Sequence, residues 1–98
     1  MDVVVSAKAE ADLQEIGDWI ARDNPIRAAS FVRELRTACA TLADMPRAFP
    51  VLPRRAESGI RRKPYRSYLI FYSVGGKRVE ILHVLHGARD YEKILFPK

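Results

Sequence analysis

Three side chains in the second half of this 98-residue chain have the types that RNA cleavage without a metal ion requires. Histidine is well suited to take up a proton near neutral pH, so His86 is a candidate general base. Arg61 and Arg89 carry planar guanidinium groups, which grip a phosphate through paired hydrogen bonds and offset its developing charge. The same groups could grip a partner without any chemistry, and the residue types leave both interpretations open.

The sequence predicts neither a metal site nor a cofactor. His83 and His86 are too few for a metal ion, which takes three or four ligands. We expect His83 to be a packed, hydrogen-bonded residue of a strand. The single Cys39 lies between Ala38 and Ala40, so we expect a buried packing thiol, not a nucleophile.

Charge is distributed unevenly along the chain. Residues 1–24 contain six acidic and two basic side chains, whereas residues 47–66 contain seven basic side chains and one acidic. A basic region of this kind attracts nucleic acid or an acidic protein segment. A solvated loop is the alternative interpretation.

Length and composition indicate a single domain, residues 1–98. No apolar run approaches the roughly 18 residues that a membrane-spanning helix needs. No signal peptide is visible after Met1. We therefore expect a cytoplasmic protein of bacterial type that has no contact with membranes.

Two helices are predicted in the first half, after a short strand at residues 3–5. Ser6 can cap a helix from residue 7 to about 22, and Asn24 can cap a second from residue 25 to about 44. The short gap between them favours an antiparallel helical hairpin.

Three strands are predicted in the second half, after an irregular connection over residues 45–58. The first runs from Gly59 to Lys63, and the next two form a β-hairpin around a Gly75-Gly76 turn. A short helix or a tail follows Gly87. The result is an α+β fold of order β-α-α-β-β-β, with the helical hairpin packed on a small, mainly antiparallel sheet.

The turn at Gly75-Gly76 fixes which side chains share a face of the sheet. With that register, Tyr72 opposes Val79 and Ile70 opposes Ile81, while Tyr68 opposes His83. The helical hairpin can cover one face only. The uncovered face is a candidate docking surface on a small domain, formed by Tyr68, Ile70, Tyr72, Val79 and Ile81.

The ordered set of motifs resembles the RelE/ParE superfamily of bacterial toxins over nearly the whole chain. Its first half carries Ala9-x-x-Asp12-Leu13-x-x-Ile16-x-x-Trp19-Ile20 and Asn24-Pro25-x-x-Ala28. Its second half carries Arg61 to Tyr65, Tyr68-x-Ile70-x-Tyr72 and Val79-x-Ile81-x-x-Val84-x-His86-x-x-Arg89-Asp90. The closing His-x-x-Arg-Asp spacing is most similar to the ParE branch, often described as plasmid stabilisation proteins.

This resemblance implies the toxin of a type II toxin–antitoxin pair, with one of two alternative targets. A ParE-like toxin inhibits DNA gyrase, and a ParD-like antitoxin neutralises it and alone carries the complex to operator DNA. A RelE-like toxin is instead a ribosome-dependent mRNA endoribonuclease. In that alternative the catalytic set is Arg61, Lys63, His86, Arg89 and Tyr91. The tail ends in Ile94-Leu95-Phe96-Pro97 without a basic finish, which favours the non-enzymatic gyrase inhibitor.

An acidic antitoxin segment needs a basic and partly apolar surface. Trp is also a frequent interface anchor. The antitoxin contacts that we predict are therefore Trp19, Arg54, Arg55, Arg61 and Arg62, together with the sheet-face residues Tyr68, Ile70, Tyr72, Val79 and Ile81.

Overall fold

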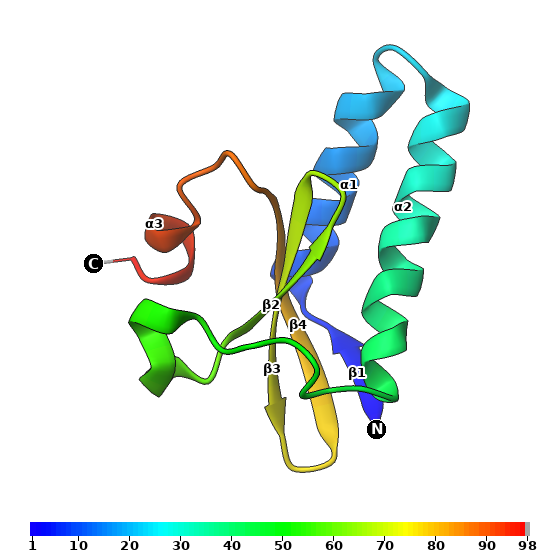
Figure 1. Ribbon diagram of the computed structural model, residues 1–98. Helices are drawn as coiled ribbons and strands as arrows, with labels where there is room; N and C mark the ends of the chain where they lie inside the picture. The colour runs from blue at the N-terminus through cyan, green and yellow to red at the C-terminus, as the bar shows by residue number, and fades with distance from the viewer. Residues whose placement is uncertain (98) are drawn as a thin grey trace.

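The computed structural model describes residues 1–97 as a four-stranded sheet between two long helices and one short helix (Figure 1). In chain order the elements are β1 (Asp2–Val5), α1 (Ala7–Ala21), α2 (Pro25–Ala40), the 3₁₀ turns η1 (Thr41–Ala43) and η2 (Pro53–Ser58), β2 (Arg61–Tyr65), β3 (Tyr68–Gly75), β4 (Arg78–His86) and α3 (Tyr91–Leu95). The strand order is β1-β4-β3-β2; β1 runs parallel to β4, and the other neighbours are antiparallel. The predicted α+β class and element order are confirmed.

Both predicted helix caps form. The Ser6 Oγ accepts a hydrogen bond from the Ala9 amide at 3.1 Å, and the Asn24 Oδ1 accepts one from the Arg27 amide at 3.0 Å. Each bond satisfies an amide that has no partner within its helix. Pro25 takes the first helical position of α2, where the missing N–H costs nothing.

The turn between β3 and β4 lies one residue later than the sequence predicted. Gly75 pairs with Arg78, so the turn residues are Gly76 and Lys77. Gly76 has a φ of 60°, and a positive φ at the first turn residue is the pattern of a type II′ turn. A turn of this type needs a positive φ at its first position only, so Gly76 alone meets the requirement. Partners of residues 72–75 shift by two positions, which keeps every side chain on its predicted face.

A β-bulge in β4 changes which face of the sheet the side chains after Ile81 occupy. Leu82 is the extra residue, because Ile81 and His83 have consecutive partners on β3. His83 therefore opposes Phe71, and the prediction that it opposes Tyr68 is wrong. A bulge re-aims the side chains that follow it, since alternation restarts after the extra residue.

The helical hairpin of α1 and α2 covers the face that the sequence analysis left uncovered (Figure 1). Four of the five predicted docking residues are fully buried against it: Ile70, Tyr72, Val79 and Ile81. Tyr68 is half-buried at the edge of the same core. The prediction of an exposed sheet face is therefore wrong. β1 and Val84 extend the apolar surface of this face. Covering it with the hairpin therefore removes the largest apolar area from water.

The opposite face is covered by the end of the chain. Phe71 and Leu85 form a second, smaller core with Leu52 from the connection before η2. Tyr91 packs on Phe71 with ring centroids 5.0 Å apart, and Phe96 joins the same cluster. The short α3 thus has a packing role, and Figure 1 shows it on the side of the sheet away from the helical hairpin.

The strand β2 starts and ends two residues later than predicted and includes Pro64. A proline lacks the amide of a ladder hydrogen bond, and β2 tolerates it because it is an edge strand. Near its start, the Arg62 amide donates to the Pro50 carbonyl at 3.3 Å.

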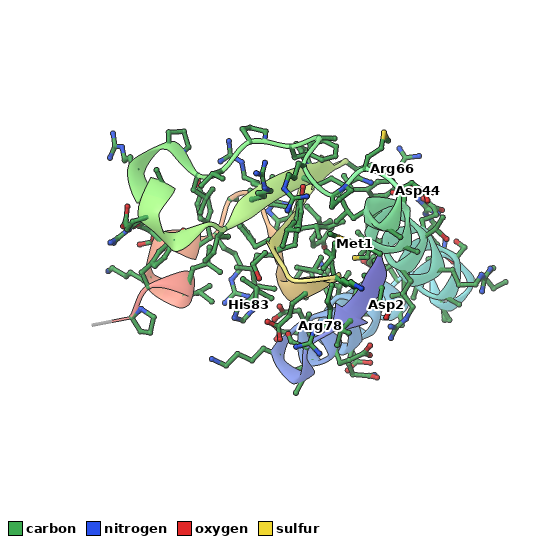
Figure 2. The ribbon with its side chains drawn as sticks, turned by 90° about the horizontal axis from the view of Figure 1, so that it is seen from below. Met1, Asp2, Asp44, Arg66, Arg78 and His83 are labelled. Carbon is green, nitrogen blue, oxygen red and sulfur yellow. The ribbon has the colours of Figure 1, made fainter. Side chains whose placement is uncertain are left out.

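The first residues of the chain lie against the end of the helical hairpin. Figure 2 shows Asp2 near Arg78, its partner on β4, and the amino group of Met1 donates to the Ala43 carbonyl at 3.3 Å. Within residues 1–97, no helix is both long enough and apolar enough to cross a membrane.

Candidate functional site

A groove lies between α1 and the last residues of β4. It exists because the two neighbouring strands differ in length: β1 ends at Val5, opposite Ile81, whereas β4 continues to His86. The groove has a volume of about 660 Å³, within the size range of small-molecule sites. We call it the Trp19 groove; its lining includes Ile16, Trp19, Tyr68, Val84, His86 and Arg89.

Aromatic side chains form much of this groove. Trp19 is 65% exposed, and the guanidinium of Arg22 lies 5.1 Å from the centre of its ring. Tyr68 and His86 meet edge to face with ring centroids 5.2 Å apart. Trp19 and Tyr68 were both predicted as antitoxin contacts, and the structure brings them to one groove.

Charged residues on α1 form one wall of the groove. Glu15 and Asp18 are exposed there, and Arg22 follows near the end of the helix. None of these three positions was predicted from the sequence as a site residue. They recur at helical spacing around Trp19, so an analysis of the polar face of α1 would have found them.

Asp12 closes the edge of β4 at the base of the groove. Its Oδ2 accepts a hydrogen bond from the Val84 amide at 2.9 Å and lies 2.7 Å from the Nδ1 of His83. Both side chains are largely buried. His83 is therefore a packed, hydrogen-bonded residue, as predicted, and it ties the sheet to α1.

The hydrogen bonds of His86 do not suit a general base aimed into the groove. Its Nδ1 accepts from the Ala88 amide at 3.0 Å. The neutral ring then carries its proton on Nε2, which makes that nitrogen a donor. His86 can therefore hydrogen-bond an acceptor in the groove.

The five residues of the ribonuclease alternative are not gathered into one site. Arg61 donates to the Phe49 carbonyl at 2.7 Å, and Lys63 donates to the Ala38 carbonyl at 2.8 Å. Tyr91 lies on the other face of the sheet, where its ring packs on Phe71. Only His86 and Arg89 line the Trp19 groove.

Lys63 has a structural position at the end of α2. Besides the Ala38 carbonyl, it donates to the Thr41 Oγ1 at 2.7 Å. A cation there offsets the negative end of the helix dipole. Burial lowers the pKa of Lys63 from its ordinary value.

The predicted basic antitoxin surface is largely engaged within the chain. We call Arg54, Arg55, Arg61, Arg62 and Lys63 the basic strip. Arg55 pairs with Glu92 at 2.7 Å and lies 4.4 Å from the ring centre of Phe96. Arg62 donates to the Tyr91 hydroxyl at 3.0 Å. Arg54 is exposed.

The thiol of Cys39 is buried, as predicted. Only 1% of the residue is exposed, and burial raises the pKa of the thiol to about 11. Reaction as a nucleophile needs the thiolate, so this side chain acts in packing. Among residues 1–97, no group of three or more potential ligand side chains is placed to hold a metal ion.

Comparison with known proteins places these features in a family. Residues 3–91 match the family model described as ParE toxin of type II toxin-antitoxin system, parDE. A solved structure described as a chromosomal ParDE TA system from P. aeruginosa is similar, with a TM-score of 0.77 and 22% sequence identity over 88% of this chain and 95% of that chain. At this identity the similarity shows a shared fold. No curated protein matches the chain.

Proposed function

Because the chain belongs to the ParE toxin family, the toxin component of type II toxin–antitoxin systems, we propose that it inhibits DNA gyrase and that a ParD-like antitoxin neutralises it. The observation that carries this proposal is the family match, which extends from β1 to the first residue of α3. The similar solved structure is itself described as a ParDE system.

The arrangement of side chains favours a toxin that binds its target over one that cleaves RNA. Cleavage without a metal needs a base, an acid and a cation within reach of one phosphate. Lys63 and Tyr91 are instead held on opposite faces of the sheet. The Nδ1 of His86 is occupied by a backbone amide.

In the cell, the proposed toxin acts in the cytoplasm on gyrase and thereby stalls replication. The ParD-like antitoxin supplies all contact with operator DNA. Of the antitoxin contacts predicted from the sequence, Trp19 and Tyr68 line the groove, and Arg54 is exposed on η2.

The proposal can be tested with purified gyrase and with growing cells. We expect the toxin to block supercoiling of a relaxed plasmid, and addition of the antitoxin from the adjoining reading frame to restore it. Messenger RNA should stay intact during the first minutes after toxin induction. Early messenger loss with normal supercoiling would replace the gyrase proposal with the RelE-type endoribonuclease.

The variant His86→Ala separates the two mechanisms further. The ribonuclease alternative requires His86 as a base, so this variant would lose toxicity. A gyrase inhibitor does not require that proton transfer. We therefore expect the original toxin and His86→Ala both to block supercoiling by gyrase. Early messenger RNA should stay intact in cells that express either protein.

A further inference from the structure

The turn between β2 and β3 holds an arginine in a backbone conformation that favours glycine. Tyr65 pairs with Tyr68, so the two turn residues are Arg66 and Ser67. Arg66 has a φ of 52°, and among residues 1–97 it is the only residue other than glycine with a positive φ. This conformation lowers stability for any residue that carries a Cβ. Strain of this kind is concentrated at functional sites, so it points to a function of the Arg66 side chain.

The turn between β3 and β4 provides a comparison within the same molecule. It also has two residues and a positive φ at the first of them, and that residue is Gly76. The geometry of such a turn therefore does not require arginine. The β2–β3 turn is also held from outside, because the Gly87 amide donates to the Ser67 carbonyl at 2.8 Å. That backbone contact forms whichever side chain residue 66 carries.

The guanidinium of Arg66 is available to a partner. The side chain is 64% exposed, and its Nε lies 3.8 Å from the Glu34 Oε1, which is beyond hydrogen-bonding distance. Glu34 is already paired with Arg27 and accepts a hydrogen bond from the Tyr65 hydroxyl at 2.7 Å. A guanidinium with free N–H groups binds a carboxylate or a phosphate through two parallel hydrogen bonds.

Arg66 lies beside a second groove, between α2 and β2. We call it the α2–β2 groove; it has a volume of about 640 Å³, and its lining includes Ser30, Arg33, Glu34, Thr37, Lys63 and Tyr65. Arg66 contacts two of these residues, Glu34 and Tyr65. Arg33 is exposed and forms no ion pair within residues 1–97. Two available arginines therefore lie at this groove, and neither of them lines the Trp19 groove.

The cations of this groove suit an acidic protein segment better than a nucleic acid strand. Lys63 already donates to the Ala38 carbonyl and to the Thr41 Oγ1. The ring of Tyr65 faces the guanidinium of Arg66 at 5.9 Å, so it is not an open platform for a base. A nucleic acid strand needs a longer row of available cations and open aromatic rings. Two guanidinium groups instead match two carboxylates of a short acidic segment.

We propose that the α2–β2 groove binds an acidic segment of gyrase, with Arg66 and Arg33 each pairing with a carboxylate. The strained turn is retained because it holds the Arg66 guanidinium at the edge of this groove. This inference rests on the proposed function. It adds to that function the surface of the toxin that meets the target and the chemistry of the segment that binds there.

The variant Arg66→Gly removes the side chain and also relieves the backbone strain. We expect the melting temperature, followed by circular dichroism, to stay the same or to rise by up to about 5 °C. The toxin concentration that half-inhibits supercoiling by purified gyrase should rise by about tenfold or more. Affinity for the antitoxin from the adjoining reading frame should change less than twofold. Weaker inhibition without loss of stability distinguishes a binding residue from a structural one.

The variant Gly76→Arg measures the strain independently. No atom lies within 4 Å of the position that a Cβ would take at Gly76, so the substitution changes only the demand on the backbone. We expect the melting temperature to fall by about 4–8 °C. An unchanged melting temperature would overturn the argument from strain, and with it the inference about Arg66.

Charge reversal tests the other arginine of the groove. Arg33→Glu should raise the half-inhibiting concentration by about tenfold or more. Lys77→Glu is the matched control, because it makes the same change of charge on an exposed residue of the turn at the opposite end of β3. We expect that control to change inhibition less than twofold. Circular dichroism confirms that each variant is folded.

Three results would overturn the inference and leave the proposed function intact. The first is full inhibition of gyrase by both Arg66→Gly and Arg33→Glu. The second is weakened antitoxin binding by these variants with unchanged inhibition of gyrase, which would assign the groove to the antitoxin. The third is binding of a DNA duplex to the toxin alone that both substitutions abolish, which would assign the groove to nucleic acid. Failure of the original toxin to inhibit gyrase would instead count against the proposed function.

Discussion

The basic strip and the Trp19 groove both combine cations with aromatic rings, but they use them differently. In the basic strip, Arg55 contacts Glu92 and Phe96, and Lys63 caps the end of α2. In the groove, Arg22 lies over an exposed tryptophan and Arg89 has no ionic partner within residues 1–97. The density of arginine in a sequence therefore does not locate a binding surface, because nearby carbonyls and carboxylates decide which cations are available.

The largest expected effect is a change in the free energy of unfolding. It concerns an apolar residue that was predicted from the sequence to lie on a docking surface. Ile70 is fully buried, so Ile70→Ala should lower the free energy of unfolding by about 2–5 kcal/mol. Trp19 is 65% exposed, so Trp19→Ala should change it by no more than about 0.5 kcal/mol. Urea denaturation of both variants measures the two values. A small loss for Ile70→Ala together with weakened antitoxin binding would restore the exposed-face interpretation.

A second comparison uses Tyr91, which the ribonuclease alternative makes catalytic. Its ring packs on Phe71 and its hydroxyl accepts from Arg62. We expect Tyr91→Ala to lower the free energy of unfolding by about 2 kcal/mol and Tyr91→Phe by about 1 kcal/mol or less. Because the proposed role is packing, Tyr91→Phe should block growth of cells as strongly as the original toxin.

Loss of toxicity in Tyr91→Phe at normal stability would contradict this role and would favour catalysis by its hydroxyl. The matched control is Tyr72→Phe, since the Tyr72 hydroxyl also makes a single hydrogen bond, which it donates to the Pro46 carbonyl at 2.9 Å. Both substitutions remove one oxygen atom and keep the ring.

Helix signals and strand patterns predicted the fold well because they act locally. Ser6 and Asn24 form the expected caps, and the hairpin of β3 and β4 forms with its turn displaced by one residue. The bulge at Leu82 was not located from the sequence, since an alternating strand pattern does not mark the position of an extra residue. A single sequence also does not show which apolar face the helices choose, because that choice depends on the summed burial of distant segments.

The candidate site was predicted only in pieces. Trp19, Tyr68, His86 and Arg89 were each singled out from the sequence, but for different roles. Their common groove depends on β1 being shorter than β4, and the sequence gives strand ends only approximately. Glu15 and Asp18 were overlooked because exposed acidic residues on a helix usually face solvent.

A third prediction tests whether Lys63 is structural. Lys63→Met removes the cation at the end of α2 and leaves the Ala38 carbonyl without this donor. We expect the free energy of unfolding to fall by about 1 kcal/mol, with toxicity unchanged at temperatures well below the melting temperature. Thermal unfolding followed by circular dichroism gives the first value, and a growth assay tests the second. Loss of toxicity in a stably folded Lys63→Met variant would contradict the structural role and would favour a direct role of Lys63 in the toxin's action.

The smallest expected effect concerns a paired carboxylate beside β2. Hydrogen bonds from Arg27 and from the Tyr65 hydroxyl lower the pKa of Glu34 below its ordinary value of 4.5. A carboxyl whose pKa is lowered by folding stabilises the native state above its unfolded pKa, and this contribution is lost as the pH falls through the folded pKa. The original chain should therefore lose stability more steeply than Glu34→Gln as the pH falls below 4.5. Thermal unfolding of both chains from pH 6 to pH 3, roughly the range in which carboxyl groups titrate, measures the difference. Because 33% of the Glu34 side chain is exposed to solvent, high salt should shrink the difference, and parallel curves at low salt would show that the pair contributes nothing to stability.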